Sequence, residues 1–217
     1  MYKFYGWALI AGTLAFLGTG TLHPSGRQML ADVQTFAHYA PINVLAHSLA
    51  LAGVWISLTG IVGLSRRFSL DRPVVVAALV SFSLAAVLVS LAAVVDGIVS
   101  TRLADAYVHS DVEADRKVLA GFMQYSYNIA SSISRYYVCA VAVAVLLFSW
   151  VAWRDRFDRG LAVAGATIAV AGFIAMVTGH LRMDVHDVLL LALGQGIWML
   201  WAGVALLRER PGALQDR

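Results

Sequence analysis

Long apolar stretches, separated by short polar and charged segments, dominate the hydrophobic pattern of the chain. A helix that crosses a membrane needs about 20 mostly apolar residues. Six stretches meet this requirement, at residues 5–22, 42–64, 73–99, 135–153, 160–179 and 185–207. Pro73 opens the third stretch, where proline suits the first turn of a helix. The pattern therefore predicts an all-α integral membrane protein, a bundle of six transmembrane helices forming a single domain.

Two of the connecting segments, residues 23–41 and 100–134, are too long to be simple turns. From Val118 onward, apolar residues recur at helical spacing. We therefore expect the fourth helix to begin near Asp115, before it enters the membrane. Residues 28–33 have the pattern of a short interfacial helix. Together these segments predict a small cap on the extracytoplasmic face.

Composition narrows the class of protein further. Hydrophobic residues make up 60% of the 217 and charged residues only 13%, whereas a soluble domain carries about a quarter charged residues. This composition excludes a soluble enzyme and a disordered protein. Cys139 is the one cysteine, so the chain cannot be a module held together by internal disulfides.

The basic residues predict the orientation of the bundle. With the N-terminus in the cytoplasm, ten of the 16 Lys and Arg residues fall on the cytoplasmic side. The two short cytoplasmic loops, near residues 65–72 and 154–159, hold three each, and short loops weigh most in the positive-inside rule. We expect both termini in the cytoplasm of a bacterium and the bundle in its cytoplasmic membrane. The net charge of +3 then reflects topology, and no nucleic-acid partner is expected.

All six histidines fall on the extracytoplasmic side of this topology. His47 lies about two turns into the second helix, and His180 and His186 flank a tight turn that contains Asp184. Imidazole and carboxylate groups are ligands for zinc, copper and iron. We expect a subset of these four residues to bind a transition-metal ion or a haem. The alternative is that Asp184 or Asp187 caps the last helix and the histidines line the headgroup zone.

A second group of polar residues lies on the third and fourth helices. Asp96 follows an unbroken apolar run, and Gln124, Asn128 and Arg135 form a polar stripe on one face of the fourth helix. A charge at such depth is costly unless it is paired or hydrated. We expect Asp96 and Arg135 to pair, either as a structural lock or beside the metal site. Arg135 could alternatively bind an anionic headgroup, a haem propionate or a substrate carboxylate.

Two further features concern packing. Gln195 lies near the middle of the last helix, where we expect it to hydrogen-bond a neighbouring helix. Small residues, among them Ala162, Gly165 and Ala169, share one face of the fifth helix. Such a face allows close helix packing, either inside the bundle or in a homodimer.

These patterns support two hypotheses about function. In the first, a His/Asp/Arg site at the extracytoplasmic face binds a metal ion or haem for redox chemistry or for hydrolysis of a lipid-like substrate. In the second, the protein is a non-catalytic membrane module that binds a lipid or hydrophobic small molecule, or a subunit of a larger membrane complex. The chain has no phosphate-binding lysine loop and no dinucleotide-binding glycine motif, so neither hypothesis involves a nucleotide.

Overall fold

The computed structural model describes residues 2–20, 33–180 and 185–209, with side chains from Leu190 onward in the last range. Every regular element in these ranges is helical. The helices are α1 (Tyr2–Thr19), α3 (Val33–His38), α4 (Ala40–Arg67), α5 (Pro73–Val94), α6 (Ser100–His109), α7 (Glu113–Arg154), α8 (Arg159–Val177) and α9 (Val185–Arg208). A π-helical segment, η1 (Val95–Val99), joins α5 to α6. The predicted all-α class is confirmed for the described residues.

Five stretches of helix in the described residues are long and apolar enough to cross a membrane. They are Ala40–Arg67, Pro73–His109, Glu113–Arg154, Arg159–Val177 and Leu190–Arg208. These helices fit an integral membrane protein. The span predicted at residues 5–22 corresponds to α1, which begins with the polar residues Tyr2 and Lys3 and is not among the five. The count of six spans therefore stays a prediction.

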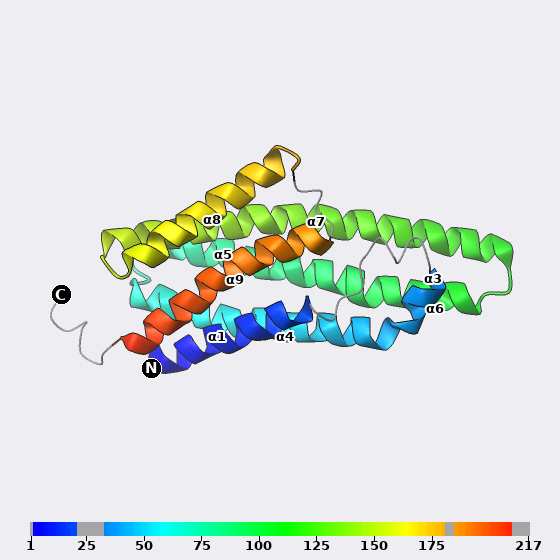
Figure 1. Ribbon diagram of the computed structural model, residues 1–217, viewed down its shortest axis with the longest axis horizontal. Helices are drawn as coiled ribbons and strands as arrows, with labels where there is room; N and C mark the ends of the chain where they lie inside the picture. The colour runs from blue at the N-terminus through cyan, green and yellow to red at the C-terminus, as the bar shows by residue number, and fades with distance from the viewer. Residues whose placement is uncertain (1, 21–32, 181–184, 210–217) are drawn as a thin grey trace.

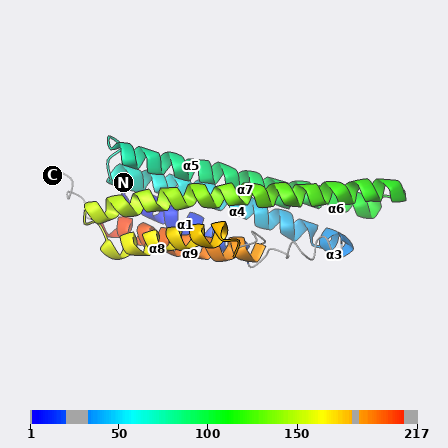
Figure 2. The same cartoon turned by 90° about the horizontal axis from the view of Figure 1, so that it is seen from above.

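The helices form an elongated bundle (Figures 1 and 2). Helix α1 packs against α4 and α9, α5 packs against α7, and α7 also packs against α8. A continuous core of buried residues, including Leu9, Ile61, Phe148 and Trp198, joins these helices. Helices α1, α8 and α9 lie along one end of the bundle, whereas α3, α6 and the first half of α7 extend beyond them. We call the extended end the distal end and the opposite one the proximal end.

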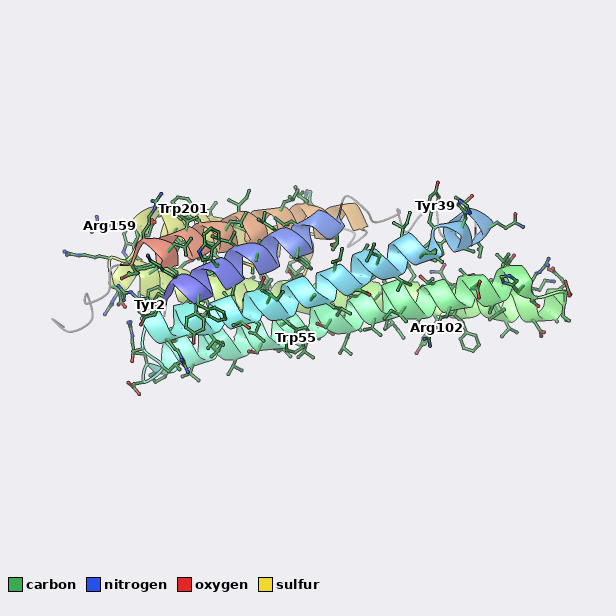
Figure 3. All side chains as sticks on the ribbon, turned by 90° about the horizontal axis from the view of Figure 1, so that it is seen from below. Tyr2, Tyr39, Trp55, Arg102, Arg159 and Trp201 are labelled. Carbon is green, nitrogen blue, oxygen red and sulfur yellow. The ribbon has the colours of Figure 1, made fainter. Side chains whose placement is uncertain are left out.

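The proximal end gathers charged and aromatic side chains. The Nε atom of Arg67 lies 2.8 Å from Oε1 of Glu209, and Nη1 of Arg72 lies 2.6 Å from Oδ2 of Asp155. Figure 3 shows Trp201 at this end as well. Arginine and tryptophan favour the membrane–water interface. We therefore expect the proximal end to lie at one membrane boundary.

The second boundary follows from helix geometry. A helix rises about 1.5 Å per residue, so the hydrocarbon core of about 30 Å takes about 20 residues. His47 stands 20 positions before Arg67, and Arg135 stands 19 positions before Arg154. We therefore expect His47 and Arg135 to lie near the second boundary, and the first part of α7 to extend beyond it.

Helices α6 and α7 extend beyond the apolar segments from which the membrane spans were predicted. Helix α7 begins at Glu113 and has 42 residues, so it is about 63 Å long. The expected start near Asp115 is confirmed. The predicted end of the third helix at residue 99 is too early, because the chain continues through η1 and α6 to His109. Ser100 and Thr101 interrupt the apolar pattern, yet both are buried inside the bundle.

A small second core holds the distal end together. Phe36 of α3, Ala104 of α6 and Met123 of α7 are buried against one another. These residues belong to the segments in which the sequence predicts a cap. Residues 28–32 of the predicted interfacial helix lie outside the described residues, and helix α3 begins at Val33. The extracytoplasmic location of this end stays a prediction.

The small residues of α8 pack inside the bundle. Ala162 and Ala169 are buried, and a Cβ atom on Gly165 would lie 2.7 Å from Cδ1 of Trp198. The absence of a side chain at Gly165 therefore lets α8 approach α9 closely. This contact agrees with the expectation of packing within the bundle.

Candidate functional site

His47 is held in one orientation by its own helix. It is buried on α4, and its Nδ1 atom lies 2.9 Å from the backbone carbonyl oxygen of Asn43, one turn earlier. A carbonyl oxygen only accepts hydrogen bonds, so Nδ1 carries a proton and donates it. The Nε2 atom therefore faces away from α4.

Asp96 of η1 meets this second ring nitrogen. The Oδ2 atom of Asp96 lies 3.3 Å from Nε2 of His47, with side-chain exposures of 23% and 7% respectively. Because both atoms carry lone pairs, they attract each other only with a cation between them, either a proton or a metal ion. The π-helical turn puts an extra residue into the helix at this point, and such turns occur often at functional sites.

Gly97, the next residue of η1, forms the surface against which the imidazole ring packs. A Cβ atom at this position would lie 2.5 Å from Nδ1 of His47 and nearer still to its Cγ atom. Any side chain here would collide with the ring. Glycine therefore allows His47 to reach Asp96 directly.

A short hydrogen-bond chain joins α4 to α6 beside the ring. The Nδ2 atom of Asn43 donates to Oγ1 of Thr101 at 3.0 Å, and Thr101 Oγ1 donates to the carbonyl oxygen of Gly97 at 2.7 Å. The Oδ1 atom of Asn43 is buried and has no hydrogen-bond partner in the described part of the chain. Asn43, His47, Asp96, Gly97 and Thr101 thus form one polar cluster, which we call the His47 cluster.

The other predicted ligands lie elsewhere or outside the described residues. His180 is exposed just after the end of α8, where its Nδ1 atom lies 2.7 Å from Oγ1 of Thr178. Helix α8 contacts α7 and α9 and has no substantial contact with α4. Asp184 and the side chain of His186 lie outside the described residues. Within the described ranges, no three His, Cys, Asp or Glu side chains gather closely enough to hold a metal ion.

The polar stripe of α7 is on the surface. Gln124, Asn128 and Arg135 are all exposed, and Nε2 of Gln124 donates to Oδ1 of Asn128 at 3.3 Å. Among the described residues, Arg135 forms no ion pair, and Asp96 pairs with His47. The predicted pair of Asp96 with Arg135 is therefore not formed: Arg135 is exposed on α7, and Asp96 lies against His47 of α4 instead.

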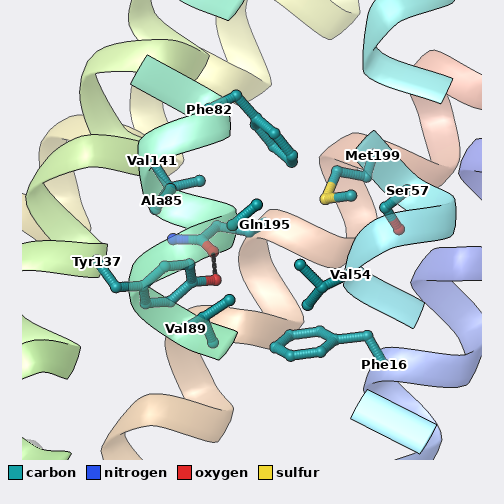
Figure 4. A pocket seen from close by; sticks show the side chains of 11 residues that line it. Phe16, Val54, Ser57, Phe82, Ala85, Val89, Tyr137, Val141, Gln195 and Met199 are labelled. Atoms are coloured by element: carbon teal, nitrogen blue, oxygen red, sulfur yellow. Dashed lines mark hydrogen bonds between the residues drawn. The ribbon is translucent and has the colours of Figure 1, made fainter. Parts of the chain in front are cut away.

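A small cavity in the middle of the bundle contains the polar residue predicted to join two helices. Tyr137 of α7 donates from its hydroxyl group to Oε1 of Gln195 on α9 at 2.6 Å (Figure 4). The expected hydrogen bond from Gln195 to a neighbouring helix is thus confirmed. Phe16, Ser57 and Phe82 also line the cavity, which has a volume of about 30 Å³. This space is enough for one or two water molecules.

Several members of the His47 cluster carry no recognisable sequence signal. Thr101 and Gly97 lie where the apolar pattern of the sequence predicts the end of a helix, and this pattern does not indicate a π-helical turn. Asn43 is one turn from His47, so its helical spacing is a usable signal. The roles of Gly97 and Thr101 follow only from the packing of η1 and α6 against α4.

The chain matches no protein-family model, no curated protein and no solved structure. The case for a function therefore comes from the geometry of the His47 cluster and its position in the bundle.

Proposed function

We propose that the protein binds a transition-metal ion between Nε2 of His47 and Oδ2 of Asp96, near one membrane boundary. The ion would serve redox chemistry or the hydrolysis of a lipid-like substrate. The observation that carries this proposal is the orientation of His47, whose Nδ1–H is held by a backbone carbonyl while Nε2 faces a carboxylate. Histidines that ligate metals usually donate the other ring N–H in this way.

The distance between the two donor atoms supports a shared ion. Zinc lies about 2.1 Å from histidine nitrogen and from carboxylate oxygen. At the tetrahedral angle, two such ligands stand about 3.4 Å apart, and the distance from Nε2 to Oδ2 is 3.3 Å. One ion could therefore touch both atoms with little movement of either side chain.

The same distance argues for a single metal ion over a haem. An axial histidine needs free space around Nε2 for the flat porphyrin ring. Asp96 lies 3.3 Å from Nε2, which is where that ring would be. Haem binding through His47 would require Asp96 to move away. The remaining coordination positions of a single ion are left for water or substrate, or for further candidates such as His186 and Asp184.

The position of the cluster supports a lipid-like substrate. By residue counting, His47 lies about one hydrocarbon thickness from the charged residues of the proximal end, at the level where lipid headgroups would meet the acyl chains. A metal ion lowers the pKa of a bound water, so that hydroxide becomes available near neutral pH. Such a nucleophile at this depth would face the ester and amide bonds of lipids. A redox-active ion in the same place would face lipid-soluble electron carriers.

Metal content tests the proposal. The protein is purified in detergent and freed of metal with a chelator. It is then incubated with Zn²⁺, Cu²⁺ or Fe²⁺ and desalted, and its metal content is measured by elemental analysis. We expect about one ion per chain in the wild type, and loss of that ion in His47→Ala and in Asp96→Asn. His180→Ala serves as the matched control and should keep the ion. Because a proton competes with the ion for Nε2, retention should weaken as the pH falls.

The proposal is wrong if His47→Ala keeps the full metal content. It is also wrong if the wild type retains none of the three metals. Size-exclusion elution of each variant separates loss of the site from loss of folding. If His180→Ala loses the ion as fully as His47→Ala, a site held by His47 and Asp96 without His180 would be wrong.

A second candidate function is a role as a subunit of a larger membrane assembly. Val118, Phe122 and Tyr125 form an exposed apolar strip on the distal part of α7, with exposures of 58%, 55% and 63%. This part of α7 extends beyond the span of about 20 residues that a membrane covers. Exposed apolar patches outside a membrane commonly mark contact surfaces. The other form of this second, non-catalytic candidate is a membrane module that binds a lipid or a hydrophobic small molecule.

The mass of the particle in mild detergent tests this second candidate. A partner on the strip should raise the polypeptide mass, measured by light scattering, above the 23.4 kDa of one chain. Phe122→Glu should restore the mass of one chain, whereas Gln124→Glu on the neighbouring polar face should not. A wild-type particle with the polypeptide mass of one chain in mild detergent would exclude the candidate.

We propose six spans, with both termini in the cytoplasm of a bacterium and the distal end as an extracytoplasmic cap. The packing of α1 against α4 and α9 supports the proposal that α1 is the sixth span. Alkaline phosphatase, which is active only outside the cytoplasm, should be inactive when fused within residues 69–71 and active when fused within residues 110–112. The opposite activities would reverse the topology.

A further inference from the structure

The turn between α7 and α8 exposes three arginines close together. Arg154, Arg156 and Arg159 are all exposed to solvent. In the described part of the chain none of them forms an ion pair. Arg156 adopts a φ of 53°, a left-handed conformation that is uncommon for a residue with a side chain. The turn thus presents three guanidinium groups within six residues.

The acidic residues of the same turn are each bound to another group of the protein. Asp155 binds Nη1 of Arg72 through Oδ2 at 2.6 Å. Asp158 accepts from the backbone N–H of Leu161 at 2.9 Å, and from Nε1 of Trp201 at 2.9 Å. Both carboxylates are therefore engaged away from the exposed arginines. The turn has a positive outer surface although its sequence alternates basic and acidic residues.

Two tryptophans lie on the membrane side of these arginines. The guanidinium carbon of Arg154 lies 5.6 Å from the centroid of the Trp150 ring, and that of Arg159 lies 5.5 Å from the Trp153 centroid. Both tryptophans are about half exposed, at 57% and 49%. Tryptophan prefers the level of the lipid headgroups. The stacking holds each guanidinium at that level.

We propose that this turn binds the phosphate headgroup of an anionic phospholipid in the adjacent leaflet. Guanidinium groups bind phosphate oxygens through paired hydrogen bonds, and the exposed faces of Trp150 and Trp153 contact the glycerol and upper acyl chains. The basic groups attract an anionic headgroup more strongly than a zwitterionic one, whose own cation they repel. The site lies at the proximal end and is independent of the His47 cluster.

Native mass spectrometry tests the site by counting lipids bound to the detergent-solubilised protein. The titrants are dioleoyl phosphatidylglycerol, which is anionic, and dioleoyl phosphatidylcholine, which is zwitterionic. A basic residue near an anionic membrane surface contributes about a fivefold gain in affinity. We therefore expect the wild type to prefer phosphatidylglycerol, and Arg154→Gln combined with Arg159→Gln to weaken its binding about 25-fold.

The matched control removes two exposed charges that lie at the proximal end but outside this turn. Lys3→Gln combined with Arg208→Gln should leave the affinity for phosphatidylglycerol within about threefold, because screening confines the effect to roughly 10 Å. Arg154→Lys combined with Arg159→Lys keeps the charge but loses the paired hydrogen bonds. We expect this variant to bind with intermediate affinity.

Three outcomes would overturn the proposal. The first is an equal loss of affinity in the control and in the Arg154/Arg159 variant, which would mean general attraction without a local site. The second is equal binding of the two lipids by the wild type. The third is complete displacement of phosphatidylglycerol by millimolar inorganic phosphate, which would make the turn a site for free phosphate.

Discussion

The contact between Gly97 and His47 makes Gly97→Ala the most informative single substitution in the chain. The added Cβ would lie 2.5 Å from Nδ1 of His47, whereas ordinary contact begins near 3.4 Å. The ring and the helix must therefore separate by about 1 Å or more. His47 cannot swing aside freely, because its two nitrogens face Asn43 and Asp96.

The expected cost of Gly97→Ala follows from two contributions. Overpacking a well-packed core costs about 1–3 kcal/mol, and the lost hydrogen bond or ion pair of His47 adds about 1 kcal/mol or more. The total is about 3 kcal/mol. For a chain of this size the melting temperature falls roughly 2–4 °C per kcal/mol, so we expect a decrease of roughly 6–12 °C. The metal content should fall as well.

Two other glycines of the bundle serve as controls for this prediction. A Cβ on Gly63 would lie 2.6 Å from Cδ2 of Tyr5, far from the His47 cluster, and a Cβ on Gly121 meets nothing within 4 Å. Gly63→Ala should therefore lower the melting temperature without affecting metal content, and Gly121→Ala should leave both unchanged. A melting temperature for Gly97→Ala within about 2 °C of the wild type, alongside a clear fall for Gly63→Ala, would refute the reasoning.

Three further substitutions test other parts of the bundle, each followed by thermal unfolding in detergent. Tyr137→Phe removes the hydrogen-bond donor to Gln195 and should lower the free energy of unfolding by about 1–2 kcal/mol. Changing Gln195 to Leu as well should recover part of this stability. If the two substitutions destabilise the protein additively, the pairing is contradicted. Arg156→Gly relieves the left-handed backbone and should stabilise the protein by about 0.5–1 kcal/mol; a lower melting temperature would mean that this conformation carries no strain. Asp155→Asn breaks the partly exposed pair with Arg72 and should cost at most about 1 kcal/mol, less at high salt, so an effect insensitive to salt would argue against an ion pair.

Helix positions could be read from the sequence because burial in a membrane imposes a local requirement on composition. Apolar runs of about 20 residues predict where helices lie, and α4, α8 and α9 begin and end within three residues of the predicted limits. The amphipathic spacing from Val118 likewise placed the start of α7 near Asp115. These features depend only on residues close together in the chain.

The partners of polar residues were predicted less well, because they depend on how the helices are arranged around the bundle. Asp96 and Arg135 stand at similar depths on consecutive helices, yet Arg135 is exposed on the surface of α7. Asp96 meets His47 of α4 instead. Depth follows from counting residues, whereas the direction in which a side chain points depends on the rotation of its helix. The sequence predicted an interhelical hydrogen bond for Gln195, but only the packed bundle identified Tyr137 as the partner.

By itself, the sequence determined the class of protein, the approximate spans and the list of polar residues that need a partner. Each of these follows from the cost of placing polar groups in hydrocarbon. Only the tertiary structure decided that His47 and Asp96 meet, because that contact depends on a π-helical turn and on the close approach of Gly97. It also separated His180 from His47 by placing α8 beside α7 and α9. Contacts between distant helices arise from side-chain packing over the whole bundle, which no local pattern encodes.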